Sequence, residues 1–306
     1  MKYFVCSDIH SFYELWQKAL KEAGYDKDNE NHTLIVCGDI FDRGYEPKEV
    51  YEFLKSIPKE RRILIRGNHE YLLKDLYERG VVLKHDRHNK THNTLAYLAD
   101  QPTEDEISKE AIFSSKIASE YADKYNKMID KQNNAIFNNP LTDEILKWIF
   151  SDEWVNYYEL DKYIFVHSFI PLRKESTFKL SGSDIPQYNP NWREDAISLE
   201  WEEAIWGCPY RLYFQYFDEE IKKGKVLVCG HWTTADFFQE LKGIDEDIYD
   251  IYYSNNLIAL DGCLAYSGQC NVMVIDEDMK CYNKGKELKE VESKIIDTQE
   301  EEVIVE

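Results

Sequence analysis

Short runs of apolar residues recur along the chain, and most of them end in a cluster of polar residues. Within each run the apolar residues are continuous, rich in β-branched and aromatic side chains, and do not alternate with polar ones. This pattern is typical of strands that are buried on both faces of a sheet. The predicted strands cover residues 3–6, 34–37, 63–65, 163–166, 226–229, 257–260 and 272–275.

Between the early strands, the apolar residues take the spacing of amphipathic helices. The first helix is expected to end at Gly24, the second to begin near Pro47, and the third to end at Gly80. Alternation of strands and helices predicts an α/β (α+β) fold in which helices cover the sheet. The faces expected to be buried are Phe12, Leu15, Ala19, Leu20 and Ala23, then Val50, Phe53, Leu54 and Ile57, then Leu72, Leu73 and Leu76.

Residues 84–140 break this alternation, because they are polar and have helical periodicity. Thr103 and Glu106 have the spacing of a capping box at the start of a helix. We interpret the stretch as a helical insertion that leans over the edge of the sheet and could act as a lid. Residues 1–285 are expected to form a single domain, and residues 286–306 a charged tail in which 303–305 could add an edge strand.

The charge of the chain excludes several classes of function. It has 37 Lys and Arg against 58 Asp and Glu, so the formal net charge is 37 − 58 = −21. This argues against a nucleic-acid binder and against attachment to anionic membranes, since both depend on basic residues. The seven cysteines are scattered without a CxxC pair, and the N-terminus lacks the pattern of a signal peptide. We therefore expect a soluble cytoplasmic protein with reduced, mostly buried thiols.

The candidate chemistry lies where the predicted strands end. In an α/β sheet the carboxyl ends of the strands converge on one crevice, so segments far apart in the sequence can meet there. Carboxylates, imidazoles and one amide, with no thiolate among them, suit two divalent ions that would activate a water as the nucleophile. Such ions would also let a phosphate dianion approach an acidic protein. The side chains concerned are Asp8, His10, Asp39, Asp42, Arg43, Asn68, His69, His167 and His231.

The motifs Gly38-Asp39-Ile40-Phe41-Asp42-Arg43-Gly44 and Gly67-Asn68-His69-Glu70 resemble those of the calcineurin-like metallophosphoesterases. Within that family the resemblance is to the branch of phosphoprotein-phosphatase type, and it runs from residue 1 to about residue 275. It implies a β-sandwich flanked by helices and a dinuclear metal site, with manganese expected and iron or zinc as alternatives. It also implies direct attack by a metal-bridging hydroxide on a phosphomonoester, with a phosphorylated protein (phosphoserine or phosphothreonine) or a small phosphate ester as substrate.

The resemblance assigns a role to each residue. Asp8, His10 and Asp39 look like ligands of the first metal, and Asp39, Asn68, His167 and His231 like those of the second. His69 resembles the general acid that protonates the leaving oxygen, and Asp42 the carboxylate that orients it. Phosphate binding is implied for Arg43 and Asn68, and Arg211 is a further candidate for gripping the phosphate.

Two other readings stay open. The segments Gly230-His231-Trp232 and Ala259-Leu260-Asp261-Gly262-Cys263 also resemble the symmetrical dinucleoside tetraphosphatases, which makes hydrolysis of dinucleoside tetraphosphates or other nucleotides the alternative function. The aromatic residues between Trp192 and Tyr216 could stack on a base or belong to the core. A non-catalytic metal-binding scaffold is a third hypothesis, disfavoured because Asp42, His69 and Arg43 are all present.

Several neighbouring residues are interpreted as structural. Arg66 is expected to form an ion pair beside the site. Glu70 could act behind the ligands or simply favour the start of a helix. His85, His88 and His92 are expected to lie in a solvated loop rather than to bind a metal.

Overall fold

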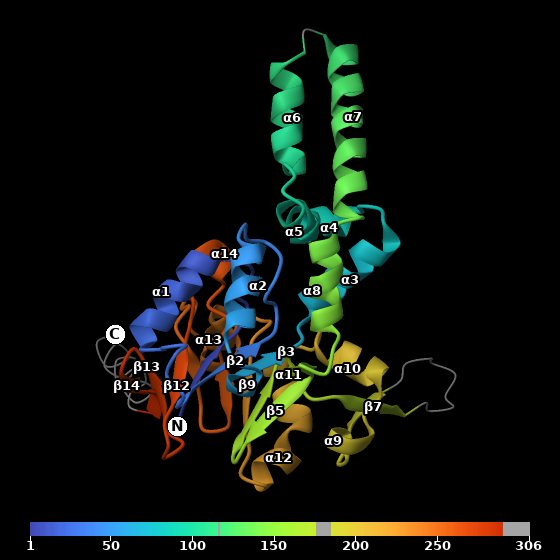
Figure 1. Cartoon of the computed structure of the whole chain (residues 1–306). Helices are drawn as coiled ribbons and strands as arrows, with labels where there is room; N and C mark the ends of the chain where they lie inside the picture. Colours follow the sequence, from blue (N-terminus) through green and yellow to red (C-terminus); the bar gives the residue numbers. More distant parts are fainter. Residues whose placement is uncertain (116, 176–184, 290–306) are drawn as a thin grey trace, which may run out of the picture.

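A computed structural model describes residues 1–115, 117–175 and 185–289. Two β-sheets pack against each other, and helices cover both outer faces (Figure 1). This agrees with the predicted helix-flanked β-sandwich. The first sheet has the order β14-β13-β12-β1-β2-β3-β4, and the second has the order β10-β11-β9-β6-β5.

Parallel strands form the centre of each sheet. In the first sheet β1, β2, β3 and β4 run parallel, and in the second β6, β9 and β11 do. Their carboxyl ends therefore lie along one edge of each sheet. The bounds in the first sheet are β1 Lys2–Cys6, β2 His32–Cys37, β3 Arg62–Ile65, β4 Trp154–Val155, β12 Met273–Ile275, β13 Cys281–Asn283 and β14 Lys286–Glu287. Those of the second are β5 Tyr157–Leu160, β6 Tyr163–Val166, β9 Val226–Cys229, β10 Tyr252–Tyr253 and β11 Leu257–Ala259, and β7 Leu172–Glu175 pairs with β8 Ile185–Tyr188 apart from both.

The strands lack alternating polarity because both of their faces are buried. In β1, Val5 points into the core between the two sheets, whereas Phe4 and Cys6 point into the core under the outer helices. Because successive side chains of a strand point to opposite faces, a continuous apolar run fills two cores at once.

The helices divide between the two outer faces. Side chains of α1 Tyr13–Ala23, α2 Pro47–Ser56, α3 Asn68–Arg79, α5 Thr91–Leu98 and α8 Pro140–Ile149 pack on the first sheet. Side chains of α9 Trp192–Asp195, α10 Ser198–Ala204, α11 Pro209–Tyr216, α12 Asp218–Lys222 and α13 Thr234–Lys242 pack on the second. The short helices η1 Lys59–Arg61, α4 Lys84–Asn89 and α14 Leu264–Ser267 complete the connections.

One predicted helix face is shifted. In α1 the fully buried side chains are Trp16 and Leu20, while Leu15 is 37% exposed. The indole offers the largest apolar surface of the helix, so the helix turns that side chain toward the sheet and leaves Leu15 at the margin.

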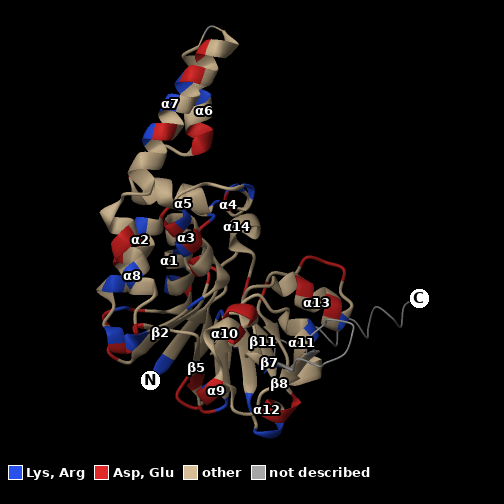
Figure 2. Ribbon diagram, turned by 90° about the vertical axis from the view of Figure 1, so that its right-hand side faces the viewer, with Lys and Arg blue, Asp and Glu red and all other residues tan. Residues whose placement is uncertain are grey.

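The insertion is helical as expected, but its direction differs from the expectation. Helices α6 Glu104–Phe113 and α7 Ala118–Ile136 form a hairpin that projects away from both sheets in the two views (Figures 1 and 2). The capping box at its start is confirmed, because the Thr103 side chain accepts the Glu106 N–H and the Glu106 carboxylate accepts the Thr103 N–H. At its base, α4 and α5 pack on each other and α5 packs on α3. A role of this stretch as a lid stays a prediction.

The folded part of the chain continues beyond residue 285. Strand β14 pairs with β13, and Leu288 is only 2% exposed. Residues 303–305, which were expected to add a strand, lie outside the described residues.

All seven cysteines are free, and four of them, including Cys6 and Cys37, are buried.

In the described part of the chain, no helix combines the length and apolar character needed to span a bilayer.

A buried carboxylate joins the outer helices of the second sheet. Glu220 is fully buried and accepts hydrogen bonds from Tyr188 (2.6 Å), Lys223 (3.1 Å) and Arg193 (2.8 Å). Arg193 also binds Glu159 on β5 through two nitrogens. Burial alone would raise the pKa of Glu220, but these donors outweigh it and lower the pKa to about 2.

We expect Glu220→Gln to lower the free energy of unfolding at pH 7 by about 2 kcal/mol, because it removes the charge that faces Arg193 and Lys223. An unfolded Glu has a pKa of about 4.3, so the contribution of the ionised group is complete above that pH and disappears as the pH falls toward 2. Urea denaturation from pH 7 to pH 3 measures the difference between wild type and variant, which should shrink below about pH 4.3. The control is Glu219→Gln, which changes the neighbouring exposed carboxylate. A difference that stays constant across this range would contradict the assignment.

Candidate active site

The side chains predicted from the strand ends meet where the two sheets come together. The first sheet supplies Asp8 and His10 after β1, Asp39, Asp42 and Arg43 after β2, and Asn68 and His69 at the start of α3. The second supplies His167 after β6 and His231 after β9. The contacts below join these five segments into one cluster.

The backbone that carries these side chains adopts a conformation that residues other than glycine rarely take. A left-handed φ costs roughly 1–2 kcal/mol for such residues. The strand ladders on either side hold these turns, so the strain fixes the direction in which each side chain points. The positive φ angles are 54° at Asp8, 48° at His10, 52° at Asp39, 72° at Asp42, 60° at Arg43 and 67° at His231.

Two glycines allow the segments to approach closely. A Cβ at Gly67 would lie 2.2 Å from Asp39 Oδ1, and a Cβ at Gly230 would lie 2.1 Å from Asp8 Oδ2. Both distances are far shorter than the non-bonded contacts that a carbon and an oxygen make. Only glycine at these positions leaves room for the two carboxylates.

Asp39 lies at the centre of the cluster. Its Oδ1 accepts the N–H of His69 (3.0 Å) and lies 3.3 Å from Nε2 of His167. Its Oδ2 lies 3.8 Å from Nε2 of both His10 and His69. Burial alone would raise the pKa of Asp39, but attraction to the surrounding imidazoles lowers it below its usual range. The group is therefore a carboxylate that reaches both halves of the cluster.

His167 presents a lone pair to two oxygen atoms. Its Nδ1 donates to the carbonyl of Cys37 (2.9 Å), so in the neutral ring the lone pair is on Nε2. That nitrogen lies 2.9 Å from Asn68 Oδ1 and 3.3 Å from Asp39 Oδ1. Burial lowers the pKa of His167, which disfavours a second proton on the ring. Three acceptors that face one another fit a shared cation.

The remaining acids and imidazoles point to the same conclusion. Burial and the neighbouring Asp261 and Asp39 raise the pKa of Asp8, and burial raises that of Asp261 to about 6. Burial, followed by His167, lowers the pKa of His231 to about 3, so its ring is a neutral ligand. Carboxylates crowded together beside neutral imidazoles are the surroundings that a divalent ion stabilises.

Two groups of ligands share Asp39. One contains His10, Asp39 and His69 and the other Asp39, His167 and His231, and the ligand atoms within each lie within 4.8 Å of one another. These residues fit two divalent ions. Asp8 is outside both groups, and its Oδ2 accepts Ser7 Oγ and the N–H of His231. His69 thus lies in the same group as His10 and Asp39, and its role as an acid and that of Asp8 as a metal ligand stay predictions.

His69 is also the end of a chain of hydrogen bonds. Its Nδ1 bonds Asp42 Oδ2 (2.9 Å), and Thr91 Oγ1 donates to the same oxygen (2.7 Å). Its Nε2 lies 3.4 Å from a guanidinium nitrogen of Arg43. Burial alone would lower the pKa of His69, but Asp39 and the bond to Asp42 outweigh it and raise the pKa above its usual value. Such an imidazole can hold a proton beside the Asp39 carboxylate.

Glu70 has a larger role than the sequence indicated. Its carboxylate accepts the N–H groups of Asp39 (3.1 Å), Ile40 (2.9 Å) and Gly67 (2.7 Å). Burial, and then the charge of Asp39, raise the pKa of Glu70 to about 7. A glutamate three residues after the glycine that precedes a helix is the available signal, but that spacing predicts only the bond to Gly67.

Arg66 and His92 differ from expectation. Arg66 forms no ion pair with a described residue; its guanidinium binds backbone carbonyls such as that of Trp154 and the side chain of Asn156. His92 lies in α5 and is buried, rather than in a solvated loop. Arg211 is exposed on α11 with its guanidinium 5.7 Å from the Tyr210 ring centre, and no described contact joins it to the cluster. Phosphate binding by Arg211 stays a prediction.

Most of the aromatic residues between 192 and 216 belong to the core. Trp192 is fully buried and Trp201 is 7% exposed. Trp206 differs, because it is 52% exposed and its ring centre lies 6.0 Å from that of His231, edge to face. It therefore forms a wall of the site on the side of the second sheet.

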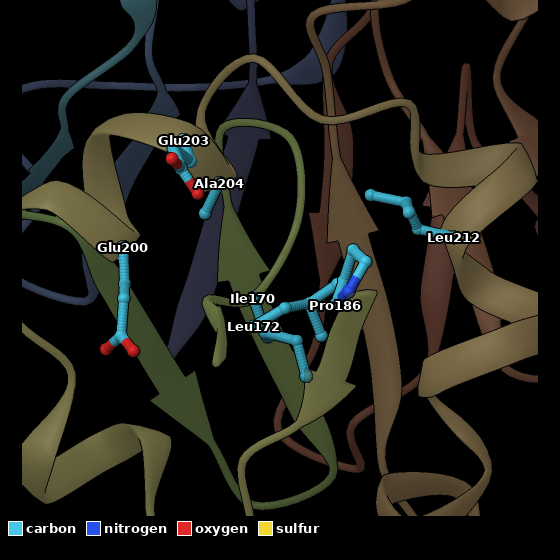
Figure 3. A pocket seen from close by; sticks show the side chains of 7 residues that line it. All are labelled: Ile170, Leu172, Pro186, Glu200, Glu203, Ala204 and Leu212. Atoms are coloured by element: carbon cyan, nitrogen blue, oxygen red, sulfur yellow. The ribbon is translucent and has the colours of Figure 1, made fainter. Parts of the chain in front are cut away.

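An apolar cavity of about 150 Å³ lies beside the residues that follow His167 in the sequence (Figure 3). Ile170, Leu172, Pro186, Ala204 and Leu212 line it, with Glu200 and Glu203 on α10. It contains none of the predicted site residues, so it is separate from the polar cluster.

Comparison with known proteins agrees with this geometry. The symmetrical bis(5'-nucleosyl)-tetraphosphatase of Proteus mirabilis is 31% identical over 107 residues, which is 35% of this chain and 36% of that protein. The serine/threonine-protein phosphatase SIT4 of Candida albicans is 36% identical over 70 residues, or 22% of each chain. The matched segments thus span about a third or less of these relatives. A crystal structure of a cold-active protein tyrosine phosphatase aligns with a TM-score of 0.50 at 14% identity, over 94% of this chain and 79% of that one, which supports the fold alone.

The sequence profile of the calcineurin-like phosphoesterase family matches residues 1–234, a range that contains every residue of the cluster except Asp261. Together with the sandwich and its shared carboxylate, this match shows that the chain belongs to the calcineurin-like phosphoesterase family.

Proposed function

We propose that this metallophosphoesterase is a phosphomonoesterase in which His69 protonates the leaving oxygen of the substrate. The proposed substrate is a phosphorylated serine or threonine of a protein. The hydrogen bond of 2.9 Å between His69 and Asp42 carries the proposal. An acid at this position matters most for alkyl esters, since an alkoxide leaves slowly without a proton. The relatives include a serine/threonine-protein phosphatase, which supports this substrate class.

Metal ions fit the ligand set, and manganese is our expectation, with iron and zinc as alternatives. Divalent cations held by Asp8, His10, Asp39, Asn68, His167 and His231 would polarise the phosphate and lower the pKa of a water molecule. They would also neutralise the carboxylates of Asp8, Asp39 and Asp261.

The chain's own groups then have separate tasks. Arg43 presents a planar guanidinium 3.4 Å from Nε2 of His69, where it can bind a phosphoryl oxygen beside the acid. Asp42 bonds Nδ1 of His69, which leaves Nε2 to face the cluster and to deliver the proton there. The amide of Asn68 can contact either a metal or the phosphate, because its Oδ1 is turned toward the His167 lone pair.

We expect Asp39→Asn to lower phosphatase turnover by about three orders of magnitude or more, because one carboxylate serves both groups of ligands. The measurement is hydrolysis of p-nitrophenyl phosphate by chelator-stripped protein titrated with manganese, zinc or magnesium, with metal content counted alongside. Wild type should regain activity with about two metals per chain. Asp161→Asn, a change of an exposed aspartate, is the control. Near-normal activity of Asp39→Asn would reject the assignment, and two bound metals without activity on any phosphate ester would favour the scaffold hypothesis.

We expect His69→Ala to slow hydrolysis of a phosphoserine peptide by roughly 100-fold or more, and that of p-nitrophenyl phosphate much less. The reason is that nitrophenolate leaves without a proton, whereas the serine alkoxide requires one. Steady-state kcat for both substrates, with metal content checked in each preparation, tests this. Equal losses on the two substrates would assign His69 to metal binding instead of acid catalysis.

The alternative is hydrolysis of a dinucleoside tetraphosphate. Its supporting observation is Trp206, an exposed ring next to His231 on which a base could stack, together with the tetraphosphatase relative.

For this alternative, Trp206→Ala should raise KM for diadenosine tetraphosphate about tenfold, by loss of roughly 1–2 kcal/mol of stacking, and leave KM for a phosphoserine peptide unchanged. Phe214→Ala, which truncates another exposed ring on the neighbouring helix, is the control. Faster turnover of the phosphopeptide than of the dinucleotide by wild type, with no effect of Trp206→Ala on either, would exclude the alternative.

A further inference from the structure

The hydroxyl group of Thr91 joins the helical insertion to the site. Thr91 is the first residue of α5 and is fully buried. Its Oγ1 donates to Asp42 Oδ2 at 2.7 Å, across 49 positions of the sequence. The same oxygen accepts Nδ1 of His69 at 2.9 Å. The carboxylate that orients the proposed acid therefore accepts both hydrogen bonds on one oxygen.

We propose that Thr91 is a positioning residue for the His69–Asp42 pair, so that the insertion completes the active centre. The inference rests on the proposed function, in which His69 delivers the proton. Asp42 is fully buried, and its second oxygen, Oδ1, has no partner among the described residues. The orientation of the carboxylate thus depends on the two bonds at Oδ2. Without the hydroxyl, the carboxylate can turn away from Nδ1.

The packing of α5 gives the hydroxyl a fixed place. Leu95 and Ala96 of this helix are fully buried, and α5 packs on α3, the helix that begins with Asn68 and His69. Lys90, just before Thr91, has a left-handed φ of 62°, which sets the direction in which α5 starts. The donor and the acid therefore stand on two helices that are packed together.

If the hydroxyl of Thr91 had a purely structural role, its loss should have the same effect as loss of another buried hydroxyl on α5. Thr94 provides that comparison. It lies one turn along the same helix and is also fully buried, yet its Oγ1 bonds no described residue. Replacing either threonine with valine removes a hydroxyl from α5 at nearly constant volume. Only the change at Thr91 alters the surroundings of Asp42.

The test compares Thr91→Val, Thr91→Ser and Thr94→Val in the full chain loaded with metal. Thr91→Val should lower kcat for a phosphoserine peptide about tenfold and leave KM unchanged, since a hydrogen bond to a charged group is lost. The effect on p-nitrophenyl phosphate should be small. Thr91→Ser, which keeps the hydroxyl, should restore most of kcat, and Thr94→Val should behave as wild type. Equal losses on the two substrates, or equal effects of the two valine variants, would overturn the proposal.

A second readout does not depend on turnover. In protein with ¹⁵N-labelled histidine, the ring signals of His69, identified by their loss in His69→Gln, should shift in Thr91→Val and not in Thr94→Val. Unchanged signals in Thr91→Val would overturn the proposal even if its activity fell. If wild type hydrolysed no phosphate ester, the proposed function would fail, and the ring signals would still decide whether Thr91 positions the pair.

Discussion

Four backbone N–H groups meet on the buried carboxylate of Glu70, and the rest of the site depends on this arrangement. They belong to Asp39, Ile40, Phe41 and Gly67, so one side chain ties the turn after β2 to the start of α3. This arrangement has a cost, because it buries a second carboxyl group next to Asp39. Burial, and then the charge of Asp39, raise the pKa of Glu70 to about 7. The donors offset part of that cost, and the same hydrogen bonds hold the left-handed turn at Asp39 in one position.

The two-sheet architecture explains how an acidic chain can hold such a cluster. The parallel strands of both sheets end along neighbouring edges, which brings acids, imidazoles and one guanidinium to a single point. Elsewhere, acidic residues are scattered along the helices and loops among lysines and arginines (Figure 2). Acidic residues outnumber basic ones in the site as they do in the whole chain. The site differs because its acidic residues are buried and held in fixed positions. This fits a centre whose positive charge comes from bound cations.

The parts of the molecule that could be predicted from the sequence are those encoded by neighbouring residues. The apolar runs gave the central strands, and the polar residues after them gave the members of the cluster, because each follows its own strand directly. The contacts of Glu70 with Asp39 and of Thr91 with Asp42 join segments about 30 and 49 positions apart, and no periodicity reports such a pairing. Two further features depend on how whole elements pack. They are the burial of Trp16 in place of Leu15 in α1 and the direction of the hairpin of α6 and α7.

The division of the ligands between the sheets has a mechanical consequence. His10 and Asn68 stand on the first sheet, while His167 and His231 stand on the second. The layer between them consists of close-packed side chains such as Val5, Phe165 and Val228. This layer acts as a spacer of fixed thickness, since protein interiors resist compression. The distance between the ligands of the first sheet and those of the second is therefore set in part by the volume of residues that do not belong to the site. A methyl group added to or removed from that layer would change this distance.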